Sequence, residues 1–227
     1  MSIKENLSLV KDNILELERL NNRSPHSVEL LAVSKRKPLE DLQNAYDCGQ
    51  RIFGENRVSE AEIKVPGLPS DALFHMIGHL QSNKVKKACS LFNTIQSVDS
   101  IKILQKIDRE CKLLGKVMNI YLDINISGED SKTGFSLDSD FPAIIDIVSC
   151  SENINLIGLM GMGSNVNNDV EIKNSFLRLV NLRDELEKIS KGKLKLSMGM
   201  SGDYHLAIEM GSDMVRVGSK IFGLRDK

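Results

Sequence analysis

The chain has 227 residues, with 30 basic and 31 acidic side chains that give a formal charge of −1. This length fits one domain with a substantial core, and the mixture of both charges along the chain argues against a nucleic-acid surface or a polybasic membrane surface. The four cysteines form no CxxC pair. The N-terminus has no signal-peptide core, and no apolar run reaches transmembrane length. We therefore expect one cytoplasmic domain over residues 1–227.

An amphipathic helix opens the chain, and short apolar runs then alternate with helical patterns. Leu7, Val10, Ile14 and Leu17 recur at helical spacing, which predicts a first helix that ends near Asn21. Strands are predicted at residues 29–34, 51–54, 73–78, 92–97, 117–124, 154–160, 194–198 and 213–217. Helices are predicted at residues 38–48, 57–64, 82–89, 99–114, 140–150, 169–190 and 203–210. Eight strands separated by helices favour an α/β fold, a (β/α)8 TIM barrel with an extra N-terminal helix.

Lys35 lies where the first predicted strand ends. It follows the apolar run 29–34 and precedes the next predicted helix. In a barrel of this kind, catalytic and binding groups lie at the carboxyl ends of the strands. A lysine at the end of a buried strand is a candidate Schiff-base nucleophile, so the sequence predicts that a carbonyl compound binds covalently at Lys35.

Small polar residues follow the seventh and eighth predicted strands. Ser201 and Gly202 open the seventh helix, while Gly218 and Ser219 follow strand eight. Barrels commonly build phosphate sites from these two loops, where hydroxyls and free amides can hold an anion. Each pair alone is more often an ordinary cap or turn, but their occurrence after both strands favours a phosphate site.

Arg216 and the histidines leave alternatives open. Arg216 has apolar neighbours within a predicted strand, where a cation is costly to bury unless it is paired. Ligand binding and a structural ion pair are both compatible with that position. His79, at the end of the third strand, is a candidate base or a residue of a loop and helix cap. The other histidines show no ligand spacing, so we predict no metal site.

Several segments resemble one known family, in the same order along the chain. They are Ala32-Val33-Ser34-Lys35, Phe53-Gly54-Glu55-Asn56, residues 75–84 (HMIGHLQSNK), residues 125–129 (NISGE), residues 196–201 (LSMGMS), and residues 215–219 (VRVGS) with 221–223 (IFG). From about residue 27 to the C-terminus, the chain resembles the YggS/PROSC family of pyridoxal 5′-phosphate (PLP) homeostasis proteins. The resemblance implies a barrel like the N-terminal domain of alanine racemase. It also implies that the protein binds PLP as a monomer and delivers it to PLP-dependent apo-enzymes.

The resemblance also implies which residues form the site. The implied cofactor-binding residues are Lys35, Asn56, Met160, Ser201, Arg216, Gly218 and Ser219. Lys35 would hold PLP as an internal aldimine, the two serines with Gly218 would bind its phosphate, and Arg216 would approach the pyridine nitrogen. The sequence departs from the family at Ser219, where threonine is commoner, and at the turn 161–163, which replaces a threonine-containing sequence.

The residues around the implied cofactor indicate restrained chemistry. Arg216 is a permanent donor that favours an unprotonated pyridine nitrogen, which makes the ring a weaker electron sink. Racemisation needs acid/base groups on opposite faces of the ring, and alanine racemases take the second one, a tyrosine, from another domain. Of the three tyrosines only Tyr204 lies near the predicted rim, where we expect it to pack. The favoured function is a non-enzymatic PLP-binding protein. A PLP-dependent amino-acid racemase and a lysine-dependent aldolase remain as alternatives.

Overall fold

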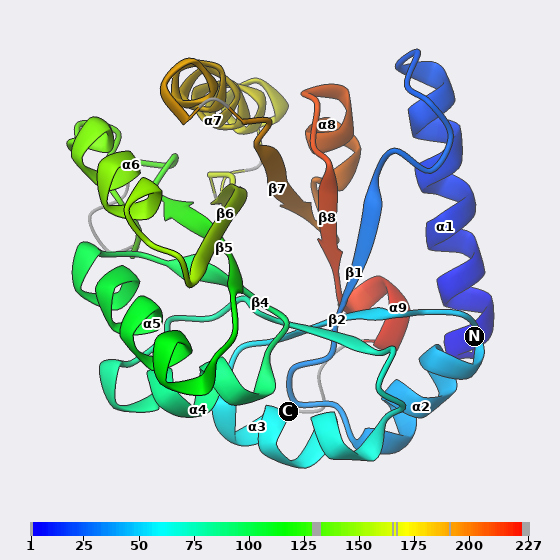
Figure 1. Cartoon of the computed structure of the whole chain (residues 1–227). Coiled ribbons are helices and arrows are strands. Elements are labelled where there is room, and N and C mark those ends of the chain that lie inside the picture. The colour runs from blue at the N-terminus through cyan, green and yellow to red at the C-terminus, as the bar shows by residue number, and fades with distance from the viewer. Residues whose placement is uncertain (1, 129–132, 165, 167, 191, 224–227) are drawn as a thin grey trace.

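The computed structural model describes residues 2–128, 133–164, 166, 168–190 and 192–223. Its parallel strands close into a barrel in the order β1 to β8 (Figure 1). The strands are β1 (Glu29–Val33), β2 (Ile52–Glu55), β3 (Leu73–Met76), β4 (Thr94–Val98), β5 (Met118–Ile124), β6 (Ile154–Gly161), β7 (Lys195–Met200) and β8 (Met214–Val217). Pairing of β1 with β8, with Leu31 opposite Arg216, closes the barrel. The predicted TIM barrel is confirmed.

Helices surround the barrel, and the predicted helices overlap them (Figure 1). They are α1 (Ile3–Leu20), α2 (Leu39–Asp47), α3 (Val58–Lys64), α4 (Val85–Leu91), α5 (Ile101–Leu114), α6 (Phe141–Ser149), α7 (Asp169–Ser190), α8 (Tyr204–Glu209) and α9 (Ser219–Phe222), with the 3-10 turns η1 (Val65–Gly67) and η2 (Ser82–Lys84). The sequence did not predict α9, a single turn directly after β8. None of the helices within the described ranges is both long and apolar enough to cross a membrane.

The extra N-terminal helix, α1, is present and packs against α2, α8 and α9. Ser2 caps its first turn by accepting from the amide of Glu5, and the Glu5 carboxylate accepts from the amide of Ser2. Leu7, Val10 and Ile14 are buried, as their helical spacing predicts. In Figure 1, α1 lies beside β1 and α9, so it covers the side of the barrel where the first and last strands meet.

Apolar side chains fill the space between the strands and the helices, whereas the barrel interior carries a polar layer. Gln96 on β4 binds Nδ1 of His75 on β3 at 2.8 Å and the sulfur of Met214 on β8 at 3.1 Å. It also accepts from the Ser197 hydroxyl on β7 at 2.7 Å. Since β4 and β8 are not neighbours, these contacts cross the interior. Burial lowers the pKa of His75 to about 3, so this histidine is neutral at physiological pH.

Candidate functional site

A cavity of about 270 Å³ opens at the carboxyl ends of the strands. Its lining residues are Val33, Lys35, Lys37, Asn56, Ile77, Met162, Met200, Ser201, Gly202, Arg216, Gly218, Ser219, Phe222 and Gly223. Six of the seven residues that the resemblance implies for the cofactor are among them, although they come from four different strand ends. The rim position and this convergence of residues indicate a binding site, because active sites of such barrels lie at this face.

Met160, the seventh implied residue, does not line the cavity. It is buried in β6, where it lies in register with Asp123 of β5 and Ser197 of β7. Met162 lies two residues further towards the carboxyl end and lines the cavity instead.

Asn56 follows β2 and contributes an amide oxygen that is buried without a partner. Its backbone is fixed by the close approach of Gly78, where a Cβ would lie 2.5 Å from the Asn56 carbonyl oxygen. A buried acceptor with no donor costs free energy. Asn56 also lines the cavity, so this strand end contributes a polar residue to it.

The turns after β7 and β8 meet through a hydrogen bond. Ser201 Oγ accepts from the amide of Gly218 at 3.2 Å. Gly218 leaves little room for a side chain, because a Cβ would lie 3.1 Å from the Val33 carbonyl oxygen. On the β7 side, Gly199 has a φ of +92° where the pairing with β8 shifts register, and this bend precedes Ser201. The result is a cradle of small residues, Ser201, Gly202, Gly218 and Ser219, with the size and chemistry for a phosphate.

Arg216 is 4% exposed and binds oxygen atoms of its own barrel. Its guanidinium donates to the carbonyl oxygen of Ser197 at 2.7 Å, to Ser197 Oγ at 2.8 Å and to the carbonyl oxygen of Gly161 at 2.9 Å. Burial lowers its pKa to about 10, and the nearby Asp123 opposes this shift. These bonds hold the guanidinium in one orientation at the base of the cavity. Its partners are carbonyls and a hydroxyl, in place of the structural ion pair that the sequence left open.

Asp123 is a buried carboxyl group on β5 that the sequence did not single out. Burial raises its pKa from 3.8 to about 7, although Arg216 acts in the opposite direction. The native state therefore holds this proton more tightly than the unfolded chain does. As the pH rises from about 4 to about 7, the native state loses stability because of this group, by on the order of 1 kcal/mol per pH unit at most.

We expect the Asp123→Asn variant to lose this pH dependence. Relative to the wild type, its free energy of unfolding should increase between pH 5 and pH 8, measured by urea unfolding at both values. Asp138→Asn is the control, because Asp138 is exposed and its carboxylate lies outside the barrel network. If the Asp123 variant and the wild type changed in parallel with pH, the raised pKa of Asp123 would be refuted.

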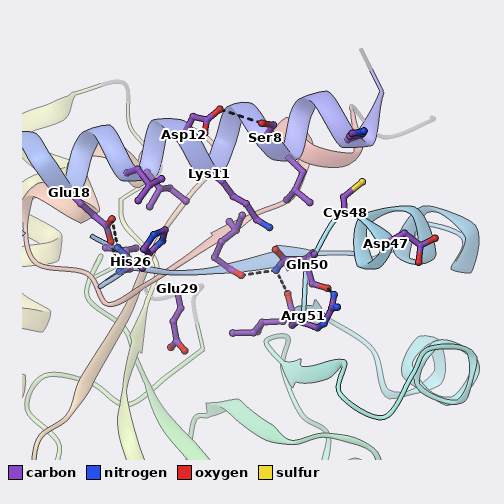
Figure 2. Close-up of a pocket in the computed structure, with 18 residues that line it drawn as sticks. Ser8, Lys11, Asp12, Glu18, His26, Glu29, Asp47, Cys48, Gln50 and Arg51 are labelled. Atoms are coloured by element: carbon purple, nitrogen blue, oxygen red, sulfur yellow. Dashed lines mark hydrogen bonds between the residues drawn. The ribbon is translucent and has the colours of Figure 1, made fainter. Parts of the chain in front are cut away.

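A larger cavity, about 740 Å³, lies between α1 and the amino-terminal ends of β1 and β2 (Figure 2). It contains none of the implied site residues. Its buried polar side chains serve the fold: Glu18 accepts from the amides of His26 and Val28, and Gln50 donates to the carbonyls of Leu30 and Ile52. Figure 2 shows the Glu18 contacts at α1 and the Gln50 contacts on the other side of the cavity. Because this face of a barrel serves stability more than chemistry, we assign function to the smaller cavity.

His79 and Tyr204, two other candidate acid/base groups, do not line the smaller cavity. His79 Nδ1 lies 2.7 Å from the Asp99 carboxylate. The Tyr204 hydroxyl donates to Asn13 Oδ1 on α1 at 2.7 Å, and its side chain is buried. Among the described residues, no group of three or more histidine, cysteine or acidic side chains could hold a metal ion.

Comparison with known proteins agrees with this fold. The model of the alanine racemase N-terminal domain family matches residues 6–226. The pyridoxal phosphate homeostasis protein of Vibrio alginolyticus is 37% identical over 230 residues, covering 99% of this chain and 98% of the relative. PipY of Synechococcus elongatus with PLP bound has a TM-score of 0.83 and 34% identity, covering 98% of this chain and 100% of PipY. Alanine racemase of Clostridium difficile has a TM-score of 0.77 and 16% identity, covering 98% of this chain and 57% of the racemase, so that likeness shows the fold alone.

Proposed function

This chain belongs to the pyridoxal phosphate homeostasis protein family, and we propose that it binds PLP reversibly at Lys35 and delivers it to other proteins. One observation carries the proposal: Lys35 and the small-residue cradle of Ser201, Gly218 and Ser219 line the same rim cavity. An aldehyde that also bears a phosphate matches this pair of features. Asn56 adds a polar residue to the lining of that cavity.

Each residue has a distinct role in holding the cofactor. PLP, when bound, supplies an aldehyde that condenses reversibly with primary amines and a ring that can act as an electron sink. Lys35 Nζ would attach to the aldehyde carbon with loss of one water. An incoming primary amine would then take its place on that carbon and release the free Lys35 amine, with no net gain or loss of water. Ser201 and Ser219 hydroxyls with the Gly218 turn would hold the phosphate. Arg216, fixed by its three hydrogen bonds, would donate to the pyridine nitrogen.

The same residues favour retention over amino-acid turnover. A permanently charged donor at the pyridine nitrogen keeps that nitrogen unprotonated, so the ring stabilises negative charge poorly. A racemase needs acid/base groups on both faces of the ring. Tyr204, the rim tyrosine, is instead bonded to Asn13 on α1. We therefore propose a binding and delivery role over the racemase alternative.

The proposal also covers the domain organisation, oligomeric state, location and recipients of the protein. Every strand in the described residues belongs to one barrel, which supports a single domain over residues 1–227. That this domain acts as a monomer is part of the same proposal. The cysteines in the described ranges are free thiols, which supports a cytoplasmic location. The proposed recipients are PLP-dependent apo-enzymes, because those proteins present the lysine amine that displaces Lys35.

A reconstitution and transfer experiment tests the function. We expect purified protein to take up PLP with a visible absorbance band, to bind it more tightly than unphosphorylated pyridoxal, and to restore activity to an apo-enzyme. Replacing Ser201 and Ser219 together by alanine should narrow the preference for PLP over pyridoxal, because it removes two phosphate donors. Failure to bind PLP would overturn the proposal. Racemisation of single amino-acid enantiomers at enzymatic rates would establish the racemase alternative instead.

A further inference from the structure

A buried charged network surrounds the turn that carries Lys35. Lys64, the last residue of α3, is 5% exposed, and its ammonium donates to three oxygens. These are the carbonyl oxygen of Ser34 at 2.8 Å, Oε1 of Glu55 at 2.8 Å and Oε2 of Glu60 at 3.1 Å. An ammonium group has three donors, so all of them are used within this network.

The network holds the backbone on both sides of Lys35. On the preceding side, Ser34 donates its hydroxyl to Glu55 Oε1 at 2.6 Å while its carbonyl accepts from Lys64. On the following side, the amide of Arg36 donates to Glu60 Oε2 at 2.6 Å. Lys35 therefore lies between two residues that are each bonded to the same cluster.

The backbone of Arg36, in this turn, adopts a conformation that is unfavourable by itself. Its φ is 61°, a left-handed conformation that costs a residue with a side chain roughly 1 kcal/mol or more. The hydrogen bond from its amide to Glu60 holds it there. Burial opposes ionisation of Glu60, but the Arg36 amide and the Lys64 ammonium together lower its pKa, so the acceptor is a carboxylate.

Stability of the fold does not by itself explain such a network. Burying an ammonium group and carboxylates carries a desolvation penalty, and apolar residues of similar size are often at least as stabilising. Glu55 is fully buried, its Oε2 has no partner, and burial raises its pKa. A costly cluster bonded to both neighbours of one cavity lysine is suited to fixing the direction of that lysine.

We propose that Lys64, together with Glu55 and Glu60, is a positioning residue that aims the Lys35 amine into the cofactor cavity. Its ammonium ties α3 and β2 to the turn after β1, so the four-carbon side chain of Lys35 starts from a fixed backbone. When a reactive group is displaced, its reaction slows steeply even if the pocket is intact. The inference rests on PLP being the ligand of this cavity.

The test compares covalent attachment with binding in the same pocket. We expect Lys64→Met to lower the rate of PLP attachment by roughly tenfold or more, measured by stopped-flow absorbance and by mass spectrometry after borohydride reduction. Binding of pyridoxine 5′-phosphate, which lacks the aldehyde and cannot attach, should stay as in the wild type. Lys87→Met is the matched control, because it breaks the exposed Lys87–Glu62 pair next to the same helix.

Removing Lys64 alone leaves Glu55 buried without its cation, so the double variant Lys64→Met with Glu55→Gln serves if the single variant does not fold. The double variant should show the same selective loss of attachment. Attachment at the wild-type rate would overturn the proposal, as would an equal loss of attachment and of pyridoxine 5′-phosphate binding, which indicates general damage to the pocket. If the wild type itself attached no PLP, the proposed function would fail instead.

Discussion

The Lys35→Ala variant should lose the visible absorbance band on addition of PLP and yield no adduct after borohydride reduction. Lys35 lies two residues beyond the carboxyl end of β1 and lines the cavity that also contains the proposed phosphate cradle. Alanine leaves that cradle, Asn56 and Arg216 in place but removes the amine that condenses with the aldehyde. We expect residual, non-covalent PLP binding that gel filtration removes, whereas the wild type keeps its cofactor. Absorbance spectra recorded before gel filtration measure the total bound PLP, and spectra recorded after it measure the PLP that the protein retains.

Lys37→Ala is the matched control, since Lys37 lines the same cavity two residues further along the chain. Its amide bonds to the Ser34 carbonyl at 3.0 Å, a backbone contact that alanine retains. We expect this variant to keep the band and the adduct, and peptide mapping should place the adduct at Lys35. An adduct in the Lys35 variant, or one mapped to Lys37 in the wild type, would move the attachment site and contradict the assignment.

The barrel could be predicted because its signal is local and repeated. Each strand is a short apolar run between helical patterns, and the alternation itself specifies a parallel sheet. The rim positions of Lys35, Ser201 and Ser219 could be predicted for the same reason, since each lies within two residues of the end of such a run. The fold then brings these strand ends to one rim whatever the details of packing.

The network around Lys35 could not be predicted, because its residues look like ordinary surface charges. Lys64 and Glu60 are four residues apart on α3, a spacing typical of an exposed helical ion pair. Lys64 is buried only because α3 packs over the turn after β1, a contact between segments about thirty residues apart. Asp123 was missed likewise, since a single acidic residue within an apolar strand does not reveal that it lies near Arg216.

Gly158→Ala should produce the largest loss of stability in the barrel wall. On β6, a Cβ at this position would lie 2.2 Å from the Lys195 carbonyl oxygen and 2.5 Å from Cε1 of Tyr121. The first neighbour belongs to the backbone of β7, and the second is a fully buried ring on β5. Neither can move aside easily. We expect a loss of roughly 3 kcal/mol, the upper end of the usual cost of overpacking. In a chain of this size that lowers Tm by about 6–12 °C in thermal unfolding.

The two contacts at Gly158 can be separated. Adding Tyr121→Leu to Gly158→Ala removes the ring but leaves the Lys195 carbonyl, so stability should return only in part. Full recovery would show that the ring alone excludes a side chain, and no recovery beyond the single variant would show that the backbone does. Gly202→Ala is the control, because no atom lies within 4 Å of its Cβ position, and its Tm should match the wild type. An unchanged Tm for Gly158→Ala would mean that β6 and β7 can separate at this point. The barrel interior would then be less rigid than we expect from the hydrogen bonds that Arg216 donates to the Gly161 and Ser197 carbonyls.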